Sequence, residues 1–194
     1  EAGRDVALTL DVELQKFVNR RLAQHRSAAA VVLDIATGDI LTMACHPSYD
    51  PNLFIGGIKS QIWKTLRSDP ATPLINKAIS GTYAPGSTFK MLVALAGLEA
   101  NVINPASTFY CPGHFNLGRA RFHCWRRGGH GYMNVKQAIK QSCDVFFYET
   151  AMKLGVERIG AMARRLGLGS RIGIDLPSEA SGLIPSLAWK RKQF

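Results

Sequence analysis

The chain has 194 residues, a net charge of +10 and a hydrophobic content of 46%. This length fits one domain with a sizeable core, and the even spread of Pro and Gly argues against disorder. No apolar stretch reaches the ~20 residues of a membrane-spanning helix, and no signal peptide opens the chain. We therefore expect the chain to be an excised piece of a longer protein.

The positive charge is scattered along the expected helices, apart from one cluster of arginines at Arg119, Arg121, Arg126 and Arg127. Aromatic residues flank this cluster, but no recognisable nucleic-acid module accompanies it, so a nucleic-acid partner is not expected. A diffuse positive field suits an anionic polymer or an anionic lipid surface equally well.

The first part of the chain predicts a helix followed by a β-hairpin. Apolar residues on one face predict a helix over 11–25, capped by Asp11 or Thr9. Two aliphatic runs, 28–34 and 39–44, predict antiparallel strands around a turn. Because a lone hairpin is rarely stable, we expect the remaining strands of its sheet after residue 194. An irregular connection with short helices should then lead to the central helix.

That central helix follows the stretch Ala84-Pro85-Gly86-Ser87-Thr88-Phe89-Lys90 and should begin near Ser87. Ser87 and Lys90 are three residues apart, so they share one helix face. A helix N-terminus favours negative charge, and apolar neighbours would favour the neutral form of Lys90. A neutral lysine can take the serine proton and so activate the nucleophile. Because such a serine is more often only a helix cap, and S-x-x-K also arises by chance, a second motif is needed.

Residues 107–133 are rich in Gly, Cys and His and are predicted as a loop. One imidazole and three thiolates would suit a closed structural zinc site. The candidate ligands are Cys111, Cys124, His130 and Cys143, with His114 and His123 in reserve. The spacing matches no standard zinc finger, and Cys111 and Cys124 could instead form a disulfide. Zinc, a disulfide and free thiols all remain open on these residues.

The C-terminal part predicts helices over 134–154 and 156–166, followed by a Gly/Ser/Pro-rich stretch. The first of them contains Ser142-Cys143-Asp144. At a junction between two helices, Ser142 and Asp144 would face one cleft and Cys143 the opposite side. A hydroxyl beside Lys90 could then relay a proton. The simpler interpretation places Ser142 inside a helix and Asp144 on its solvent face.

Together, Ser87-x-x-Lys90 and Ser142-x-Asp144 resemble two of the three motifs of serine enzymes that react with penicillin. Along nearly its whole length the chain resembles the transpeptidase domain of class B penicillin-binding proteins of the elongation type. Further matching stretches include Pro47-Ser48-Tyr49-Asp50-Pro51-Asn52, Gly128-Gly129-His130-Gly131 and Gly173-Ile174-Asp175-Leu176-Pro177. The implied fold is α/β (α+β), penicillin-binding-protein/serine β-lactamase-like, with a helical subdomain and an antiparallel sheet of which only the first hairpin strands are present.

The resemblance implies that Ser87 is the acylated nucleophile, Lys90 the general base and Ser142 a proton relay, with Asp144 at a place often held by Asn. Peptidoglycan D-Ala-D-Ala stem peptides would be the substrate, and β-lactam antibiotics would acylate the same serine. The third motif, K-T-G, does not occur here. Residues 1–194 are therefore expected to be the N-terminal portion of a transpeptidase domain, with 107–133 as an inserted Cys/His-rich loop and no activity of its own.

The resemblance also implies a structural zinc ion at the Cys/His-rich loop, because some relatives hold zinc there, and no organic cofactor. It places the catalytic domain at the periplasmic face of the bacterial inner membrane, with a membrane anchor upstream and other elongation-complex cell-wall proteins as partners. Two alternatives remain: a serine β-lactamase or penicillin-sensor domain, and a non-catalytic zinc-stabilised binding fragment.

Overall fold

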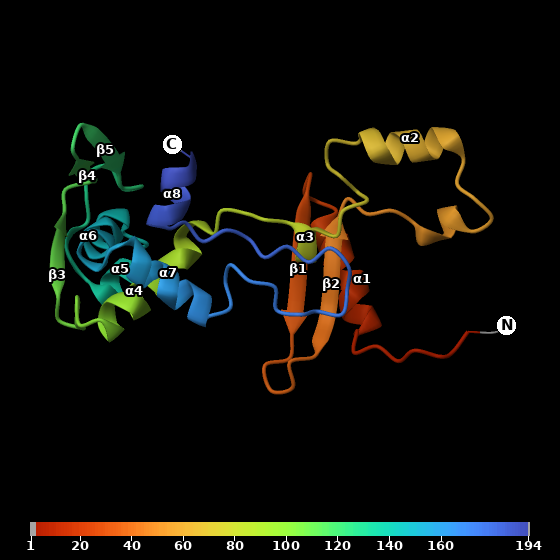
Figure 1. The fold of residues 1–194 in the computed structure, drawn as a ribbon, viewed down its shortest axis with the longest axis horizontal. Coiled ribbons are helices and arrows are strands. Elements are labelled where there is room, and N and C mark those ends of the chain that lie inside the picture. Colours follow the sequence, from red (N-terminus) through yellow and green to blue (C-terminus); the bar gives the residue numbers. More distant parts are fainter. Residues whose placement is uncertain (1–2, 194) are drawn as a thin grey trace. The chain divides into compact units, whose positions relative to one another are not determined.

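The computed structural model describes residues 3–193. They form two compact units, and Figure 1 labels most of their helices and strands. The first unit contains the described residues up to Thr82 together with Asp175–Ala180. The second contains Tyr83–Ile174 and the described residues from Ser181 onward. Within the described range, no helix combines the length and apolar character needed to cross a bilayer.

The first unit is built on the predicted helix and hairpin. Helix α1 (Val12–Leu22) is capped by Asp11, whose carboxylate accepts the Leu14 N–H at 2.9 Å, and it packs against strand β2. Strands β1 (Ala28–Leu33) and β2 (Ile40–His46) pair antiparallel, with the first residue of β1 opposite the last of β2. Both predicted elements are therefore confirmed, although the helix ends earlier than expected.

The rest of the first unit is an irregular connection with short helices, as predicted. These are η1 (Pro51–Phe54), α2 (Ser60–Ser68) and α3 (Lys77–Ser80). The C-terminal part of this unit is tied to α3, because the Ser80 hydroxyl donates to the Ser178 carbonyl at 2.7 Å.

The second unit has a helical centre. Its helical elements are η2 (Gly86–Thr88), α4 (Phe89–Glu99), α5 (Val135–Lys140), α6 (Asp144–Leu154), α7 (Val156–Arg165) and α8 (Leu187–Gln193). Helix α4 packs against α6 and α7. The core contains Phe146, which is fully buried and contacts the rings of Phe109 and Phe147. The region predicted as helical over 134–154 is divided into α5 and α6 by a junction, which was one of two interpretations of Ser142-Cys143-Asp144. Helix α8 was not predicted in the Gly/Ser/Pro-rich stretch.

Segment 107–133 is not the plain loop that its composition predicts. Strand β3 (Thr108–Cys111) pairs antiparallel with β6 (Gly131–Asn134), and β4 (His114–Leu117) with β5 (Ala120–His123). Strands of four residues are too short to carry a clear alternating pattern. The pairing of β3 with β6 also joins residues far apart in the sequence, which no local signal reports.

Candidate active site and Cys/His cluster

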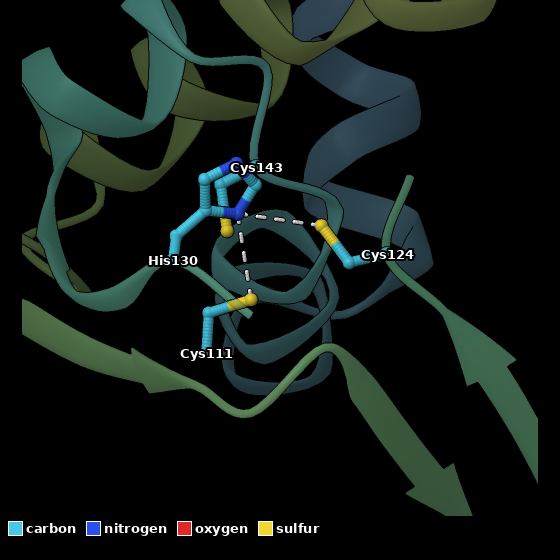
Figure 2. Close-up of side chains that lie close together, drawn as sticks. All are labelled: Cys111, Cys124, His130 and Cys143. Atoms are coloured by element: carbon cyan, nitrogen blue, oxygen red, sulfur yellow. Dashed lines mark hydrogen bonds between the residues drawn. The ribbon is translucent and has the colours of Figure 1, made fainter. Parts of the chain in front are cut away.

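The four predicted metal ligands meet in the second unit (Figure 2). Cys111 ends β3, Cys124 follows β5, His130 precedes β6, and Cys143 lies between α5 and α6. Their ligand atoms all lie within 4.8 Å of one another, and the three cysteines are buried. We call this set the Cys/His cluster.

The backbone of the loop holds these side chains together. The His130 N–H donates to the Cys111 carbonyl at 3.1 Å, and the Cys124 N–H donates to the Gly113 carbonyl at 2.9 Å. Gly129 has φ +79°, and a Cβ there would lie 2.2 Å from the Cys111 carbonyl oxygen. A side chain at this position would collide with backbone, so glycine permits the approach that brings Cys111 and His130 together. The reserve ligands His114 and His123 are instead opposite each other in β4 and β5.

The spacing of the donor atoms fits a tetrahedral ion. Nδ1 of His130 lies 3.5 Å from Sγ of Cys124 and 3.6 Å from Sγ of Cys111. Zinc bonds of roughly 2.3 Å to sulfur and 2.05 Å to nitrogen at a tetrahedral angle would separate these ligands by about 3.6 Å. All four cysteines of the chain, each within the described residues, are free thiols. The open alternative of a disulfide between Cys111 and Cys124 is therefore not what the structure contains.

The protonation of the cluster residues determines how they could bind a metal ion. Burial, with the neighbouring Cys111 and Cys124 thiols, raises the pKa of Cys143 to about 12. Burial and the charge of Arg126 lower the pKa of His130, so its imidazole is neutral at neutral pH. Neutral imidazole is the form that binds metal, and a metal ion displaces thiol protons. The donor set therefore suits a soft or borderline ion such as zinc.

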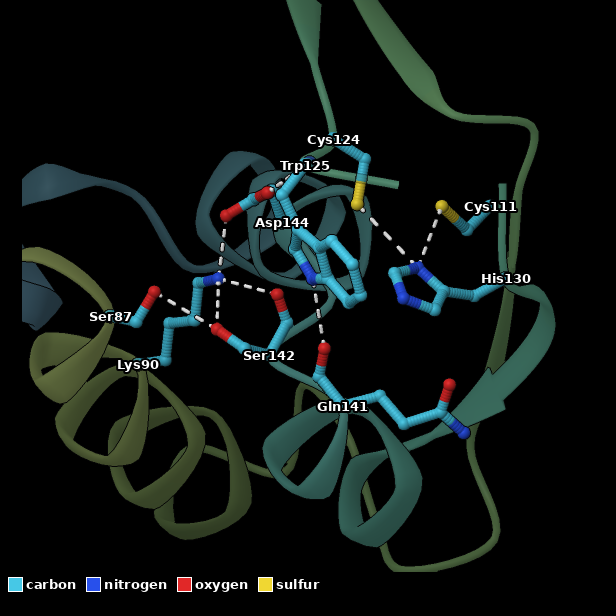
Figure 3. A network of polar contacts seen from close by, with 9 residues as sticks. All are labelled: Ser87, Lys90, Cys111, Cys124, Trp125, His130, Gln141, Ser142 and Asp144. Carbon is cyan, nitrogen blue, oxygen red and sulfur yellow. Dashed lines mark hydrogen bonds and ion pairs between the residues drawn. The ribbon is translucent and has the colours of Figure 1, made fainter. Parts of the chain in front are cut away.

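The four predicted catalytic residues also come together, in a set that we call the serine network (Figure 3). Ser87 lies in η2 and Lys90 in the first turn of α4. The Ser142 hydroxyl donates to Oγ of Ser87 at 2.9 Å. Nζ of Lys90 donates to Oγ of Ser142 at 3.0 Å and to its carbonyl at 2.8 Å. No side chain caps α4, so Ser87 does not have the capping role that we weighed against catalysis.

Asp144 completes the serine network from the start of α6. Oδ1 accepts from Nζ of Lys90 at 2.5 Å, and Oδ2 accepts from the Trp125 N–H at 2.9 Å. Burial alone would raise the pKa of Asp144, but the hydrogen bonds from Lys90 and Trp125 outweigh it and hold the pKa below its usual value. The Lys90 amine has an apolar neighbour, the Phe147 ring at 5.9 Å, but its hydrogen-bond partners are a carboxylate, a hydroxyl and a carbonyl.

The junction between α5 and α6, residues 141–143, belongs to both sites. Cys143 is fully buried in the Cys/His cluster, whereas Ser142 and Asp144 contact Lys90. The prediction of opposite orientations is confirmed, and the interpretation of Ser142 as a helix-interior residue is wrong. Ser142 has φ +51°, a left-handed conformation that is uncommon for a residue with a side chain. Such strain occurs preferentially at functional sites.

Trp125 is the residue of this region that sequence reasoning missed. Its backbone N–H contacts Asp144, and its indole N–H donates to the Gln141 carbonyl at 2.9 Å. In the sequence it stands out only as an aromatic residue beside the arginines. Its position directly after the candidate ligand Cys124 could have indicated that Trp125 lies near the two sites.

Comparison with known proteins identifies the family. Residues 28–193 match the family model of the penicillin binding protein transpeptidase domain. The peptidoglycan D,D-transpeptidase MrdA of Escherichia coli K12 is 43% identical over 196 aligned residues, which cover 100% of this chain. The chain spans only 31% of the length of that relative.

Solved structures give the same result. PBP2 of Pseudomonas aeruginosa superposes with a TM-score of 0.91 and 42% identity, over 98% of this chain and 44% of that one. PBP2 of Helicobacter pylori, solved in complex with MreC, superposes with a TM-score of 0.90 and 35% identity, over 95% of this chain and 34% of that one. The predicted fold class is thus confirmed. The chain belongs to the penicillin-binding-protein transpeptidase family and is part of a transpeptidase domain similar to that of PBP2.

Proposed function

We propose that this chain is the N-terminal portion of the catalytic domain of a peptidoglycan D,D-transpeptidase that cross-links the cell wall during elongation. The contact of Ser87 with Ser142 at 2.9 Å, and of Ser142 with Lys90 at 3.0 Å, carries the proposal. A nucleophile that is linked to a base through one hydroxyl fits covalent catalysis. The name of the E. coli relative supports the activity. Because the chain covers about a third of that relative, the activity belongs to the complete domain.

In the proposed reaction, Ser87 Oγ attacks the penultimate carbonyl of a D-Ala-D-Ala stem peptide. Lys90 would first release a proton to solvent and react as the neutral amine. The serine proton then passes to this amine through the hydroxyl of Ser142, which contacts both groups. Collapse of the tetrahedral intermediate breaks the peptide bond, and D-alanine leaves with a proton returned from the same relay. The amine of a neighbouring strand then attacks the Ser87 ester, loses a proton to the relay and restores the serine.

Two further groups would support this chemistry. The backbone N–H of Ser87 would donate to the negative oxygen of the tetrahedral intermediate, with a second donor from the strand of the third motif. Asp144 would direct Lys90 toward the hydroxyls, because its Oδ1 accepts from the amine at 2.5 Å. β-Lactams would acylate Ser87 by the same attack, since their strained amide presents an equivalent carbonyl.

We further propose that the Cys/His cluster holds a structural zinc ion, bound by Cys111, Cys124, His130 and Cys143. Four protein ligands leave no open position, as in structural rather than catalytic zinc sites. A bound ion would supply a cross-link between the loop and the α5–α6 junction. No organic cofactor is part of the proposal.

The cellular setting is also a proposal. A domain that acts on peptidoglycan would lie at the periplasmic face of the inner membrane, with its anchor outside this chain. The MreC complex of the H. pylori relative supports other cell-wall proteins of the elongation complex as partners.

The proposed activity is tested by the intact mass of protein carrying the complete transpeptidase domain, before and after incubation with a penicillin. The expected result is one added drug mass, absent in Ser87→Ala and retained in the control Ser60→Ala, which changes an exposed serine of α2. A wild-type protein without an adduct would overturn the proposal. Rapid hydrolysis of the adduct would favour the serine β-lactamase alternative instead.

The zinc proposal is tested by metal analysis of the same protein. We expect one zinc per chain, lost in Cys124→Ser and kept in Cys45→Ser, because Cys45 lies outside the cluster. Removal of the metal with a chelator should lower the melting temperature of the wild type. A folded, metal-free wild type that melts at the same temperature with and without added zinc would overturn the proposal.

A further inference from the structure

Trp125 connects the two sites through contacts that the proposed reaction does not use (Figure 3). Its indole N–H donates to the Gln141 carbonyl at 2.9 Å, and its ring lies edge-on to that of His130, with centroids 5.3 Å apart. We propose that Trp125 is a positioning residue, which holds Ser142 in the backbone conformation that places its hydroxyl between Ser87 and Lys90. The inference rests on the proposed function of that hydroxyl.

Two hydrogen bonds hold the peptide unit that joins Gln141 to Ser142. Its carbonyl accepts from the Trp125 indole, and its N–H donates to the Ile139 carbonyl at 3.2 Å. The orientation of this unit about the N–Cα bond is the φ angle of Ser142, which is +51°. A residue with a Cβ ordinarily relaxes to negative φ. The indole is therefore one of two anchors that oppose this relaxation.

The peptide unit on the other side of Ser142 is anchored independently. Its carbonyl accepts from Lys90 at 2.8 Å, and the Cys143 N–H donates to the Ala138 carbonyl at 2.9 Å. Because the chain is anchored on both sides of Ser142, a change in its φ angle has to be compensated by neighbouring backbone angles. This compensation would shift the Ser142 Cα and, with it, Oγ. That atom bridges Ser87 and Lys90, and a displacement of about 1 Å in an active site can lower the rate about 100-fold.

The role can be separated from packing, because the Trp125 side chain is largely on the surface. Trp125 is 63% exposed, so its ring contributes little to the core. Its other polar contact, to Asp144, comes from the backbone N–H and is independent of the side chain. Trp125→Phe therefore removes the donor to Gln141 and keeps an aromatic ring beside His130.

The test measures the rate of Ser87 acylation by a fluorescent penicillin as a function of its concentration, in protein carrying the complete transpeptidase domain. For Trp125→Phe we expect the rate at saturation to fall about tenfold or more, with an unchanged half-saturating concentration and melting temperature. The matched control is Trp63→Phe in α2, where the indole contacts only Phe54 and Arg67 among the ring interactions of the described residues. This control should acylate at the wild-type rate.

A second replacement isolates the N–H group. In 3-benzothienylalanine a sulfur atom takes the place of the indole N–H in a ring of nearly the same shape, and we expect the same fall in rate when it replaces Trp125. The role of Trp125 would be overturned if this isostere reacted within twofold of the wild-type rate. It would also be overturned if the fall in rate came with an equal fall in the Trp63→Phe control or with a lowered melting temperature. An unreactive wild type would instead refute the proposed function itself.

Discussion

Ser142 and Cys143 are neighbours in the chain, yet they belong to sites of opposite physical character. In the serine network, hydroxyl, ammonium and carboxylate groups meet with Ser87 exposed to solvent, as a substrate and mobile protons require. In the Cys/His cluster the three cysteines are at most 1% exposed. One site is open where chemistry would occur, and the other is closed where an ion would stabilise the fold. The α5–α6 junction couples the two sites. Variants that disrupt one site and leave the other intact therefore measure how strongly the sites depend on each other.

The largest effect is expected for Lys90→Met, which should break the serine network and leave the cluster intact. Loss of the base should lower the acylation rate roughly 10²- to 10⁴-fold. Asp144 would lose its cation, so we also expect a loss of about 1–3 kcal/mol in the free energy of unfolding. The zinc content should be unchanged. The control is Lys136→Met on an exposed position of α5, and a rate within tenfold of wild type would contradict the role of Lys90.

An intermediate effect is expected for Gly129→Ala, which should break the cluster first. A Cβ at Gly129 would collide with the Cys111 carbonyl oxygen, whereas Gly118, also at positive φ, has no neighbour within 4 Å. The steric clash should make Gly129→Ala less stable than Gly118→Ala by about 1–3 kcal/mol. Metal content and the midpoint of urea unfolding measure the difference. Equal stabilities with full zinc in both variants would show that the close approach is unimportant for the cluster.

The smallest effect is expected for Asp144→Asn, which should separate charge from geometry. Asparagine keeps one oxygen acceptor for the Trp125 N–H or the Lys90 amine, but removes the ion pair. Hydrogen bonds to charged groups are stronger than neutral ones by about 1 kcal/mol, so the acylation rate should stay within about tenfold of wild type. Asp144→Ala, which removes both acceptors, should fall further. If both variants are equally slow, the charge of Asp144, and not its geometry, determines the orientation of Lys90.

Local sequence patterns determined much of this protein. The spacing of Ser87 and Lys90 requires only one helical turn, and the hairpin in the first unit follows from its aliphatic runs and central turn. The sequence predicted one helical region over 134–154, and a break at Ser142-Cys143-Asp144 was only one of two interpretations; the structure has that break. The four residues of the Cys/His cluster were likewise predicted from donor chemistry and resemblance, and the structure brings them together.

Only the tertiary structure decided which residues complete the sites. Lys90 and Asp144 are 54 positions apart, and their ion pair depends on the packing of α4 against α6. The pairing of β3 with β6 and the close approach at Gly129 bring Cys111 to His130. The indole of Trp125 reaches Gln141, 16 positions away, from a backbone held by Asp144 and next to Cys124 of the cluster. Contacts of this kind leave no periodic or propensity signal in the sequence, since each partner is specified by long-range packing and not by its neighbours in the chain.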